Sequence, residues 1–406
     1  MNVINHKPAL LVVASTFPRW EGDREPPFVF ELCRRLVDAW DVHVLAPLAA
    51  GARREENMEG ITVTRFPYFL KPWQRLAYDG GILPNLKRRP WLAGTVPFFL
   101  AGELAAILGK LQSRRFAVVH AHWLIPQGLM TALALLLTGD RIPFLSTTHG
   151  GDMYGLQGWL FDALRRFVLH RSAGITAVSR AMGASAVALG ARPEALKIIP
   201  MGVDLQSVFV PPAVPRGGNR LLFVGRLVEK KGLSYLIKAM HRIVQRHPDV
   251  QLTVVGSGPE ENRLKHEAAT LGLSGRIVFS GPVTNAELPP FYQEADICVF
   301  PSGDREGFGL VLVEALGCSC PVVATDLPAV RDVVIPGRTG LLVPEKSPES
   351  LAECISGLLE NTERRESLGR EGRQFVLVRY DWAIIAAAYS RFLEELMCRG
   401  TDGCNS

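Results

Sequence analysis

Two glutamates eight positions apart, Glu306 and Glu314, stand in the stretch SGDREGFGLVLVEALG, which covers residues 302–317. Two carboxylates can act as acid and nucleophile at a sugar, but such a pair must lie only about 5 Å apart. The apolar run that follows the glycines predicts a buried helix, and eight helical residues rise about 12 Å. The spacing therefore favours two contacts at opposite ends of one ligand over a catalytic carboxylate pair.

A glycine-rich turn separates the two glutamates and predicts an anion site. The NH groups at the start of a helix have no partner within the helix, and the helix dipole favours negative charge there. We expect the backbone of Phe308, Gly309 and Leu310 to bind phosphate. Because a buried carboxylate needs a partner, we expect Glu314 to have one.

Basic residues flank another strand-to-helix turn, in FVGRLVEKKGLSYLIKAM. The chain turns at Gly225, and Arg226 and Lys231 lie next to the start of the following helix. This arrangement predicts a diphosphate site, with solvated loop charges as the alternative. A similar turn in VVGSGPEENRL places Gly256 where the backbone can approach a ligand closely, although the third glycine of a dinucleotide fingerprint is absent.

Length and composition predict a globular chain with two domains. Its 406 residues exceed the size at which one hydrophobic core keeps growing, and 48% hydrophobic with 21% charged residues argue against a disordered or fibrous protein. The start of the chain lacks the pattern of a signal peptide, and the longest apolar runs fall short of the ~20 residues that span a bilayer. The seven cysteines form no CxxC pair, which favours free thiols in a reducing cytoplasm.

Apolar runs of strand length alternate with amphipathic segments of helix length along the chain. This pattern predicts parallel strands buried on both faces, and therefore an α/β fold with two doubly wound sheets. Ligands bind outside the carboxyl ends of such strands, so we expect the site in a cleft between two domains. The expected divisions are an N-terminal domain over residues 1–205, a linker rich in Pro and Gly over 206–219, a C-terminal domain over 220–380, and a helix with a tail over 381–406 that packs back towards the N-terminal domain.

The stretch EGFGLVLVE matches the E-x7-E signature of a known family, and further motifs extend over nearly the whole chain. These motifs are STFPRWEGD, HAHWLIPQG, THGGD, IIPMGVD, FVGRLVEKKG, VVGSGPE, PVVATDLPAVRDVV and GRTGLLV. With them the chain resembles the retaining nucleotide-sugar glycosyltransferases of family 4, which have the GT-B fold. The resemblance implies two Rossmann-like domains that face each other across a cleft, the first for the acceptor and the second for the nucleotide sugar.

The resemblance also implies an activity. A hexosyltransferase of this kind moves a hexose from a UDP- or GDP-linked donor to a hydroxyl of a glycan or a lipid-linked acceptor, with retention and by a front-face mechanism. Its expected role is polysaccharide, glycolipid or cell-envelope glycan synthesis. Such enzymes need no cofactor and no bound divalent metal, and the chain has no D-x-D triplet. The alternatives are a nucleotide-sugar epimerase or hydrolase on the same fold, and a non-catalytic sugar-nucleotide-binding subunit.

The resemblance assigns roles to the residues introduced above. Glu306 would bind hydroxyls of the transferred sugar and Glu314 the ribose hydroxyls, while the two basic residues would neutralise the diphosphate. The loop GPVT, residues 281–284, would present its backbone to the base. The implied donor-binding residues are Gly225, Arg226, Lys231, Gly256, Pro282, Val283, Glu306, Gly307, Phe308, Gly309, Leu310 and Glu314. The implied catalytic residues are His149, Glu306, Arg226 and Lys231.

Histidines and an aspartate in the first half complete the expected site. His149 closes a predicted strand in TTHGGD, and in the family the residue at this place lies against the donor sugar, where it would stabilise an oxocarbenium-like transition state; a histidine lining the core is the alternative. Asp152 is expected either to meet the acceptor hydroxyl or to cap a helix. His120 and His122 share one side of a strand, so a metal triad with His149 is a further arrangement, which we do not favour.

The first loop, TFPRWEGDREPP, departs from the family. Many members carry a Gly-Gly pair that approaches the phosphates, whereas this loop has Gly22 alone and a bulky Trp20. We expect Gly22 and Asp23 to contribute a first-loop contact on the acceptor side.

Basic charge is concentrated in the first half, where residues 1–205 carry 23 Lys/Arg against 16 Asp/Glu. Within it, residues 66–115 carry eight Lys/Arg, two acids and several aromatic residues. This mixture of basic and aromatic residues suits anionic headgroups. For a protein that we expect in the cytoplasm, we therefore hypothesise peripheral contact with the inner face of the membrane. A pocket wall with solvated charge is the competing interpretation. Nucleic acid is not an expected partner, because the basic excess is small and no binding motif accompanies it.

Overall fold

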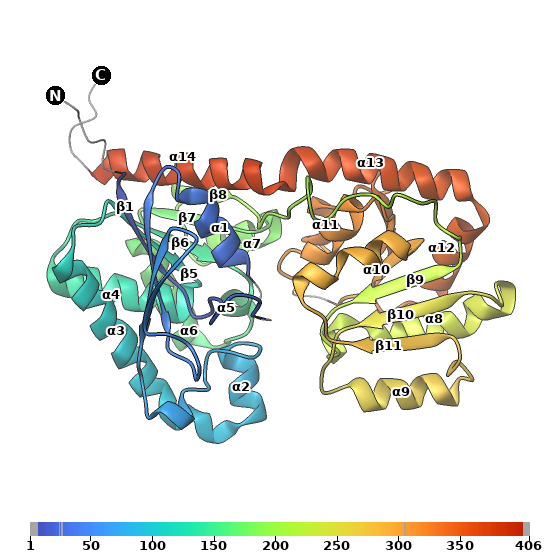
Figure 1. Cartoon of the computed structure of the whole chain (residues 1–406), viewed down its shortest axis with the longest axis horizontal. Helices are drawn as coiled ribbons and strands as arrows, with labels where there is room; N and C mark the ends of the chain where they lie inside the picture. The colour runs from blue at the N-terminus through green and yellow to red at the C-terminus, as the bar shows by residue number, and fades with distance from the viewer. Residues whose placement is uncertain (1–6, 24, 26, 304–305, 401–406) are drawn as a thin grey trace. The chain divides into compact units, whose positions relative to one another are not determined.

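The computed structural model describes residues 7–23, 25, 27–303 and 306–400. The chain divides into two compact units. Unit 1 contains the chain up to Pro200 together with the segment from Ile385 onwards, and unit 2 is Met201–Ile384. Each unit is a parallel α/β sheet with helices, drawn in Figure 1 in blue to green and in yellow-green to orange, so the predicted fold class is confirmed.

Unit 1, within the described residues, has an eight-stranded sheet in the order β3-β4-β2-β1-β5-β6-β7-β8. Neighbouring strands are parallel except at the edge, where β3 and β4 are antiparallel. Strands β1, β5 and β6 are buried along their full length, as expected for strands covered on both faces. The bounds are β1 Ala9–Val13, β2 Asp41–Pro47, β3 Glu55–Met58, β4 Ile61–Phe66, β5 Val118–His122, β6 Phe144–Thr148, β7 Gly174–Ala177 and β8 Leu196–Ile198.

Unit 2 has a sheet of six parallel strands among its described residues, in the order β11-β10-β9-β12-β13-β14. Its core consists of the inward side chains of these strands and of helices α8 and α12, which pack against each other. The bounds are β9 Arg220–Val224, β10 Gln251–Val255, β11 Ile277–Gly281, β12 Ile297–Phe300, β13 Val322–Thr325 and β14 Gly340–Val343.

The helices connect the strands in the alternating order that the sequence predicts. Between β8 and β9 the chain has neither a helix nor a named strand, and carries one isolated bridge, between Val203 and Asp381. The bounds are α1 Phe28–Leu36, α2 Ile82–Arg88, α3 Val96–Ser113, α4 Leu129–Thr138, α5 Gly151–Tyr154, α6 Trp159–Arg171, α7 Arg180–Ala188, α8 Leu233–Arg246, α9 Glu261–Thr270, α10 Pro289–Glu294, α11 Leu310–Gly317, α12 Pro348–Glu360, α13 Thr362–Tyr380 and α14 Trp382–Gly400.

The last helix, α14, begins in unit 2 and continues in unit 1. In unit 1, Phe392 and Leu396 are buried against the start of β7, where a Cβ built on Gly174 would lie 2.8 Å from side-chain atoms of both. Trp40 donates to Ser390 Oγ at 3.1 Å on the same helix. The final segment of the chain therefore completes the core of the unit that the first 200 residues begin.

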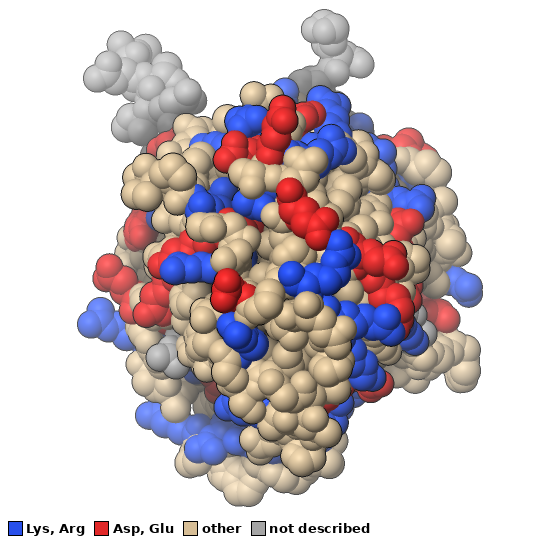
Figure 2. Space-filling model, turned by 90° about the vertical axis from the view of Figure 1, so that its right-hand side faces the viewer, with Lys and Arg blue, Asp and Glu red and all other residues tan. Residues whose placement is uncertain are grey.

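Acidic and basic side chains are mixed on the surface. On the face drawn in Figure 2, Lys and Arg are interspersed with Asp and Glu. Within unit 2, ion pairs of 2.6 Å join α8 to α12, between Arg242 and Glu349 and between Arg246 and Glu360. The face in Figure 2 thus carries mixed charge rather than the continuous basic field typical of nucleic-acid binding.

One stretch of the described chain, Pro90–Ser113, is long and apolar enough to cross a membrane by length and composition alone, with a mean hydropathy of 1.6. The expectation that every apolar run is too short was therefore wrong. Glu103 interrupts this run, but the mean hydropathy of the whole stretch stays high enough for a membrane-spanning helix. In the structure the stripe Phe99, Ile107 and Leu111 of α3 packs into the core of unit 1. Of the apolar window of this stretch, however, only 28% is buried inside the structure, so most of it lies outside the core.

Glu103 on this helix is fully buried. Its Oε1 accepts a hydrogen bond from Gln127 Nε2 at 3.0 Å, and within the described residues its Oε2 has no partner. Burial raises the pKa of Glu103 to about 8, while the bond from Gln127 lowers it by less. The folded protein therefore holds this proton at pH values where the unfolded chain has lost it, and stability falls as pH rises from about 4.5 to 8.

We predict that Glu103→Gln removes this loss. The variant should match the wild type near pH 4.5 and exceed it by about 2–4 kcal/mol above pH 8, measured by urea unfolding across that range. Glu55→Gln, at an exposed position in β3, is the control and should leave the pH dependence unchanged. Parallel pH profiles for wild type and Glu103→Gln would contradict the prediction.

Candidate active site

The predicted donor-binding residues of unit 2 gather at one edge of its sheet. The turns at Gly225, Gly256 and residues 281–284 follow β9, β10 and β11, and the turn 306–310 follows β12. These four strands are consecutive in the sheet order, so their carboxyl ends lie side by side. Hydrogen bonds join the turns, from Gly225 N to Val255 O at 3.0 Å and from Gly256 N to Gly281 O at 2.9 Å.

Glycine is required at two of these turns. Gly256 has φ 135°, and a Cβ built on it would lie 2.0 Å from the carbonyl oxygen of Gly225. Gly232 has φ 70°, and its Cβ would lie 2.0 Å from Pro301 O. Any side chain at either position would collide with backbone. Gly232 ends the short 3-10 turn Glu229–Lys231 and begins α8, which fixes where Lys231 leaves the backbone.

Glu306 and Lys231 form an ion pair across this edge. Glu306 Oε2 accepts from Lys231 Nζ at 2.7 Å and from Ser302 Oγ at 2.8 Å. Both side chains are largely buried, at 12% and 22% exposure. Burial alone raises the pKa of Glu306, but the charge and hydrogen bond of Lys231 lower it below its usual value, so Glu306 is ionised at neutral pH.

Glu314 occupies a different environment, on helix α11. Tyr292 OH donates to its Oε2 at 2.7 Å, and Asn285 Nδ2 donates to its Oε1 at 3.3 Å. Glu314 is 6% exposed, and burial raises its pKa. The partner that burial requires is therefore Tyr292, aided by Asn285. The two glutamates have separate sets of partners, which fits two contacts rather than a proton-sharing pair.

Sequence reasoning missed both partners of Glu314. Asn285 directly follows the loop at residues 281–284, and this position is the only feature of the sequence that could have indicated Asn285 as a partner of Glu314. Tyr292 lies in α10, whose sequence PPFYQE carries no chemical motif. Ser302, the second partner of Glu306, lies in the same stretch of residues 302–317, but only the fold shows that its hydroxyl reaches the carboxylate.

Arg226, Pro282 and Gly307 lie in the turns at the same edge, with Arg226 and Pro282 exposed. Helix α11 begins after Gly309, so the backbone of Phe308, Gly309 and Leu310 lies at a helix N-terminus, where an anion is favoured. The structure thus brings together the whole donor-binding set that was predicted for unit 2, Val283 included.

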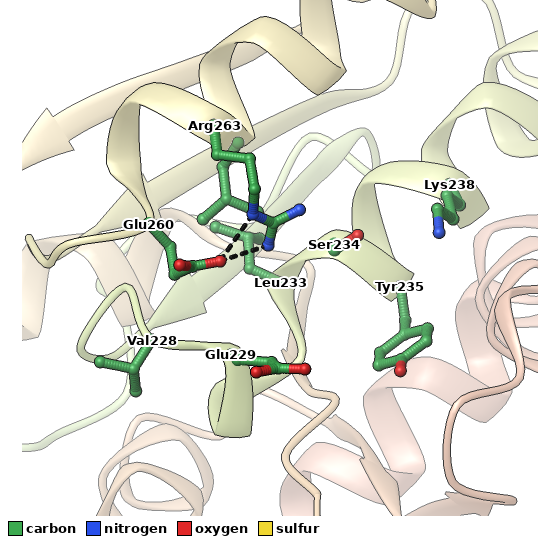
Figure 3. Close-up of a pocket in the computed structure, with 9 residues that line it drawn as sticks. Val228, Glu229, Leu233, Ser234, Tyr235, Lys238, Glu260 and Arg263 are labelled. Carbon is green, nitrogen blue, oxygen red and sulfur yellow. Dashed lines mark hydrogen bonds and ion pairs between the residues drawn. The ribbon is translucent and has the colours of Figure 1, made fainter.

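A pocket of about 320 Å³ lies beside this edge, between the starts of α8 and α9 (Figure 3). It shares Val228 and Glu229 with the loop that carries Arg226 and Lys231. Arg263 and Glu260 form an ion pair of 2.6 Å at its wall. None of the predicted donor-binding residues lines this pocket.

In unit 1 the neighbouring strands β5 and β6 bring His122 and His149 together. His122 pairs in register with Thr147, and His149 follows the end of β6. His122 Nδ1 and His149 Nε2 are hydrogen-bonded at 3.0 Å. Among the residues that the structure describes, no group of three His, Cys, Asp or Glu side chains is arranged to hold a metal ion. The His149 ring also contacts the rings of Phe28 and Trp123.

Asp152 organises the turn that carries His149. Its Oδ1 accepts from Thr148 Oγ1 at 3.1 Å and from the backbone NH of His149 and Gly150, and its Oδ2 accepts from Leu124 N at 2.7 Å. The side chain is 3% exposed, and burial raises its pKa. Asp152 is the second residue of α5 and Gly150 is the N-cap, so the expected helix-capping role is wrong. Its carboxylate instead joins the turn after β6 to the turn after β5.

We predict that Asp152→Asn destabilises the protein by about 2–4 kcal/mol, because an amide NH₂ must replace one oxygen that now accepts buried hydrogen bonds. The free energy of unfolding in urea would measure this. Asp162→Asn is the control, since the Asp162 side chain is 41% exposed and its carboxylate pairs with Arg165. A loss below about 0.5 kcal/mol for Asp152→Asn would contradict the prediction.

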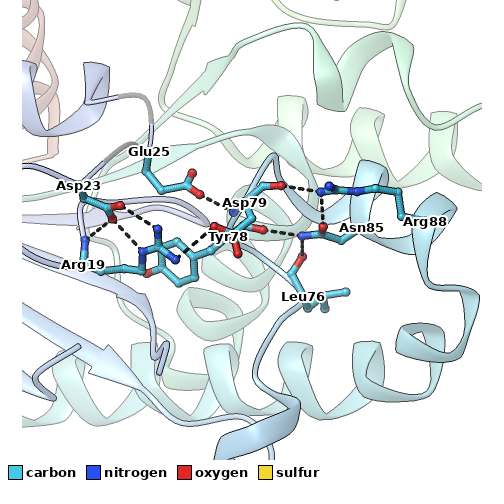
Figure 4. Close-up of polar contacts among 8 residues, drawn as sticks. All are labelled: Arg19, Asp23, Glu25, Leu76, Tyr78, Asp79, Asn85 and Arg88. Atoms are coloured by element: carbon cyan, nitrogen blue, oxygen red, sulfur yellow. Dashed lines mark hydrogen bonds and ion pairs between the residues drawn. The ribbon is translucent and has the colours of Figure 1, made fainter. Parts of the chain in front are cut away.

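The first loop is held by ionic contacts, drawn in Figure 4. Arg19 donates to both oxygens of Asp23, through Nε at 2.8 Å and Nη2 at 2.7 Å, and to Asp79 Oδ1 at 3.2 Å. Glu25 accepts from Asp79 N, so the loop is tied to the chain near α2. Although burial raises the pKa of Asp23, the contacts with Arg19 lower it below its usual value. Asp23 therefore orders the loop, and Gly22 beside it has φ 76°.

Two α/β units, one of which has acidic and basic side chains and free backbone NH groups at its strand ends, are the arrangement expected of a two-domain enzyme that binds nucleotides. Residues 27–202 match the family model described as glycosyl transferase 4-like domain, and residues 208–375 match that of glycosyl transferases group 1. The chain belongs to this glycosyltransferase family, with the GT-B fold. The predicted family and enzyme class are confirmed.

Relatives include the phosphatidyl-myo-inositol mannosyltransferase of Mycolicibacterium smegmatis, 32% identical over 297 residues that cover 70% of this chain and 72% of that protein. The protein of the same name from Mycobacterium leprae is 34% identical over 298 residues, 70% of this chain and 75% of the relative. Among solved structures, the sucrose-phosphate synthase of Thermosynechococcus elongatus has a TM-score of 0.76 at 22% identity, over 97% of this chain and 100% of that one. HepE of Anabaena with UDP-glucose has a TM-score of 0.74 at 18% identity, over 96% and 100%.

Proposed function

We propose that the protein transfers a hexose, with retention, from a UDP- or GDP-linked donor to a hydroxyl of a glycan or lipid-linked acceptor. The observation that carries the proposal is the Lys231–Glu306 ion pair next to the start of α11, at the edge where four parallel strands end. One further relative, 29% identical over 299 residues covering 68% of this chain and 74% of the relative, is named a GDP-mannose-dependent alpha-(1-6)-phosphatidylinositol monomannoside mannosyltransferase, from Mycobacterium tuberculosis. GDP-mannose and an inositol phospholipid are therefore the first substrate pair to test, with UDP-glucose second.

The side chains support a metal-independent front-face mechanism. Lys231 carries three N–H donors and uses one at Glu306, so it has capacity to bind phosphate and to offset charge that develops on the leaving diphosphate. Arg226 would share this role, and Glu306 would orient sugar hydroxyls through Oε1. The leaving phosphate oxygen would accept the proton of the acceptor hydroxyl as the new glycosidic bond forms on the same face. His149 would contact the donor sugar.

We predict that Glu306→Gln lowers the transfer rate by about 100-fold or more, because the amide keeps the shape but loses the charge that holds Lys231. Release of GDP or UDP in the presence of acceptor measures the rate. Glu229→Gln, at an exposed position in the neighbouring turn, is the control and should retain activity. Full transfer by Glu306→Gln would defeat the assignment.

The same assay discriminates the rival functions. Without acceptor, a transferase should leave the nucleotide sugar largely intact, whereas formation of an epimer or rapid release of free sugar would indicate an epimerase or a hydrolase. A thermal-shift screen across nucleotide sugars identifies the donor, since a ligand that binds the folded state raises its apparent stability. Donor binding without transfer to any acceptor would favour a non-catalytic subunit.

We further propose that the enzyme is cytoplasmic and binds the inner face of the membrane through an exposed apolar patch, which consists of Phe69, Leu70, Trp73, Trp91 and Phe98. Ring pairs hold the patch together, with centroids 5.0 Å apart for Trp73 with Trp91 and for Phe69 with Phe98. Leu70 is 68% exposed and the two tryptophans are about half exposed.

Two further observations bear on this membrane proposal. Lys71, Arg75 and residues 87–89 add positive charge next to the patch, which suits anionic headgroups. Tyr68 and Tyr78 of the segment 66–115 are buried in the core, so these two aromatic residues are not available for contact with a membrane.

We predict that the purified protein floats with anionic phospholipid vesicles at low salt, and less with zwitterionic vesicles or at high salt. Replacing both Trp73 and Trp91 by Ala should reduce binding roughly tenfold, because it removes most of the apolar area of the patch. Trp159→Ala is the control, since Trp159 is 81% exposed on α6 and outside the patch. Absence of flotation with anionic vesicles at low salt would overturn the membrane proposal and leave the transferase proposal intact.

A further inference from the structure

Two histidines, the fully buried His122 and the partly exposed His149, are hydrogen-bonded to each other at the strand ends of unit 1. His122 Nδ1 and His149 Nε2 are 3.0 Å apart. Burial lowers the pKa of His149 to about 3 and that of His122 well below its usual value, so both rings are neutral at physiological pH. A neutral imidazole has one N–H, and in a bond between two such rings only one of the facing nitrogens can be protonated. Either His122 donates to His149 or the reverse.

The other nitrogen of His122 decides between these tautomers. His122 is fully buried, and its Nε2 has no hydrogen-bond partner among the described residues. If His149 donated, the proton of His122 would lie on Nε2 and would be a buried N–H without an acceptor. A bare lone pair at that place costs less, because orphaned buried N–H groups are rarer than under-used acceptors. His122 is therefore protonated on Nδ1 and donates to His149 Nε2.

A chain of hydrogen bonds also determines the tautomer of His120, whose ring lies on the other side of His122. Tyr389 OH donates to the carbonyl oxygen of Ile199, at 3.4 Å, and a carbonyl can only accept. Tyr389 can then only accept from Thr176, at 3.4 Å, and from Thr147, and these two threonines are 2.5 Å apart. Whichever of these two oxygens it bonds, Thr147 gives its one proton away from His120. His120 Nε2 donates to Thr147 Oγ1 at 2.7 Å.

His120 is therefore a neutral ring protonated on Nε2, and its ring centroid lies 4.1 Å from that of His122. His120 is therefore not a cation against this face of His122, and no described residue hydrogen-bonds to His122 Nε2. The arrangement keeps His122 neutral and its one proton directed at His149.

We propose that His122 is a positioning residue that holds His149 in the tautomer protonated on Nδ1. Since Nε2 of His149 is occupied by the bond from His122, Nδ1–H is the group that His149 presents to a ligand oxygen. This inference rests on the proposed function, in which His149 contacts the donor sugar, and it makes the contact a donated hydrogen bond to a sugar oxygen. The alternative is a pair of core histidines whose tautomers do not matter for transfer.

The tautomer is tested directly by NMR of the full chain labelled with ¹⁵N-histidine, with assignments from His122→Asn and His149→Gln. We expect His149 to show a protonated Nδ1 and an unprotonated Nε2, and His122 the same pattern. A protonated Nε2 in His149 overturns the inference. This result does not depend on activity, so it stands or fails separately from the transferase proposal.

Kinetics test whether the tautomer matters for transfer. In His122→Asn the amide nitrogen can take the place of Nδ1 and donate to His149, so kcat should stay within about threefold of the wild type. His122→Leu removes the donor and should lower kcat roughly tenfold with little change in KM. His170→Asn, at an exposed position on α6, is the control and should have no effect.

Each result bears on one proposal. An unchanged kcat for His122→Leu overturns the positioning role even if the tautomer is as expected. If His122→Leu does not fold, the comparison of His122→Asn with wild type and the NMR spectrum still decide. Absence of transfer by the wild-type protein with every nucleotide sugar would instead count against the proposed function.

Discussion

Parallel pairing of buried strands is the constraint on which both units depend. Parallel strands send all their carboxyl ends to one edge of a sheet, and the helices that follow begin there. In unit 2 this places the turns after β9, β10, β11 and β12 next to one another, although more than 80 residues separate the first from the last. In unit 1 it places His122 beside His149. The candidate site residues of both units lie near helix starts, where backbone NH groups have no partner inside the helix.

The buried carboxylates at these sheet edges each need a hydrogen-bonding partner, because burial removes them from water. Glu306 has Lys231, Glu314 has Tyr292, and the carboxylate of Asp152 binds backbone NH groups of two turns. These contacts already fix the side chains before a ligand arrives, so binding has less conformational entropy to overcome. Charge is also held in place before the reaction, which is the arrangement that stabilises a transition state most effectively. Site geometry and folding stability therefore have the same physical origin.

Sequence reasoning succeeded where a property is local. Strand patterns and glycine turns follow from residue types and spacing, and they predicted the fold class. The family followed from the resemblance of motifs along the chain to a known family. It could not find Tyr292, because the partner of a buried carboxylate is chosen by how α10 packs beside α11 and not by the sequence of α10.

The sequence could not give the pairing of Arg19 with Asp23 and Asp79 either, since the second contact spans 60 residues. For Asp152, the sequence left a ligand contact and a capping role open. Four hydrogen bonds from its own chain decide how its oxygens are used.

Helix α14 has a consequence for how this chain folds during its synthesis. Phe392, Leu393 and Leu396 are buried in unit 1, and Tyr389 ends the hydrogen-bonded chain that reaches His120. The ribosome adds these residues only after all of unit 2 has been synthesised. Unit 1 therefore has one apolar surface uncovered while all of unit 2 is synthesised, although domains more commonly fold in order from the N-terminus. The time needed to translate unit 2 therefore determines how long this apolar surface of unit 1 can bind chaperones or aggregate.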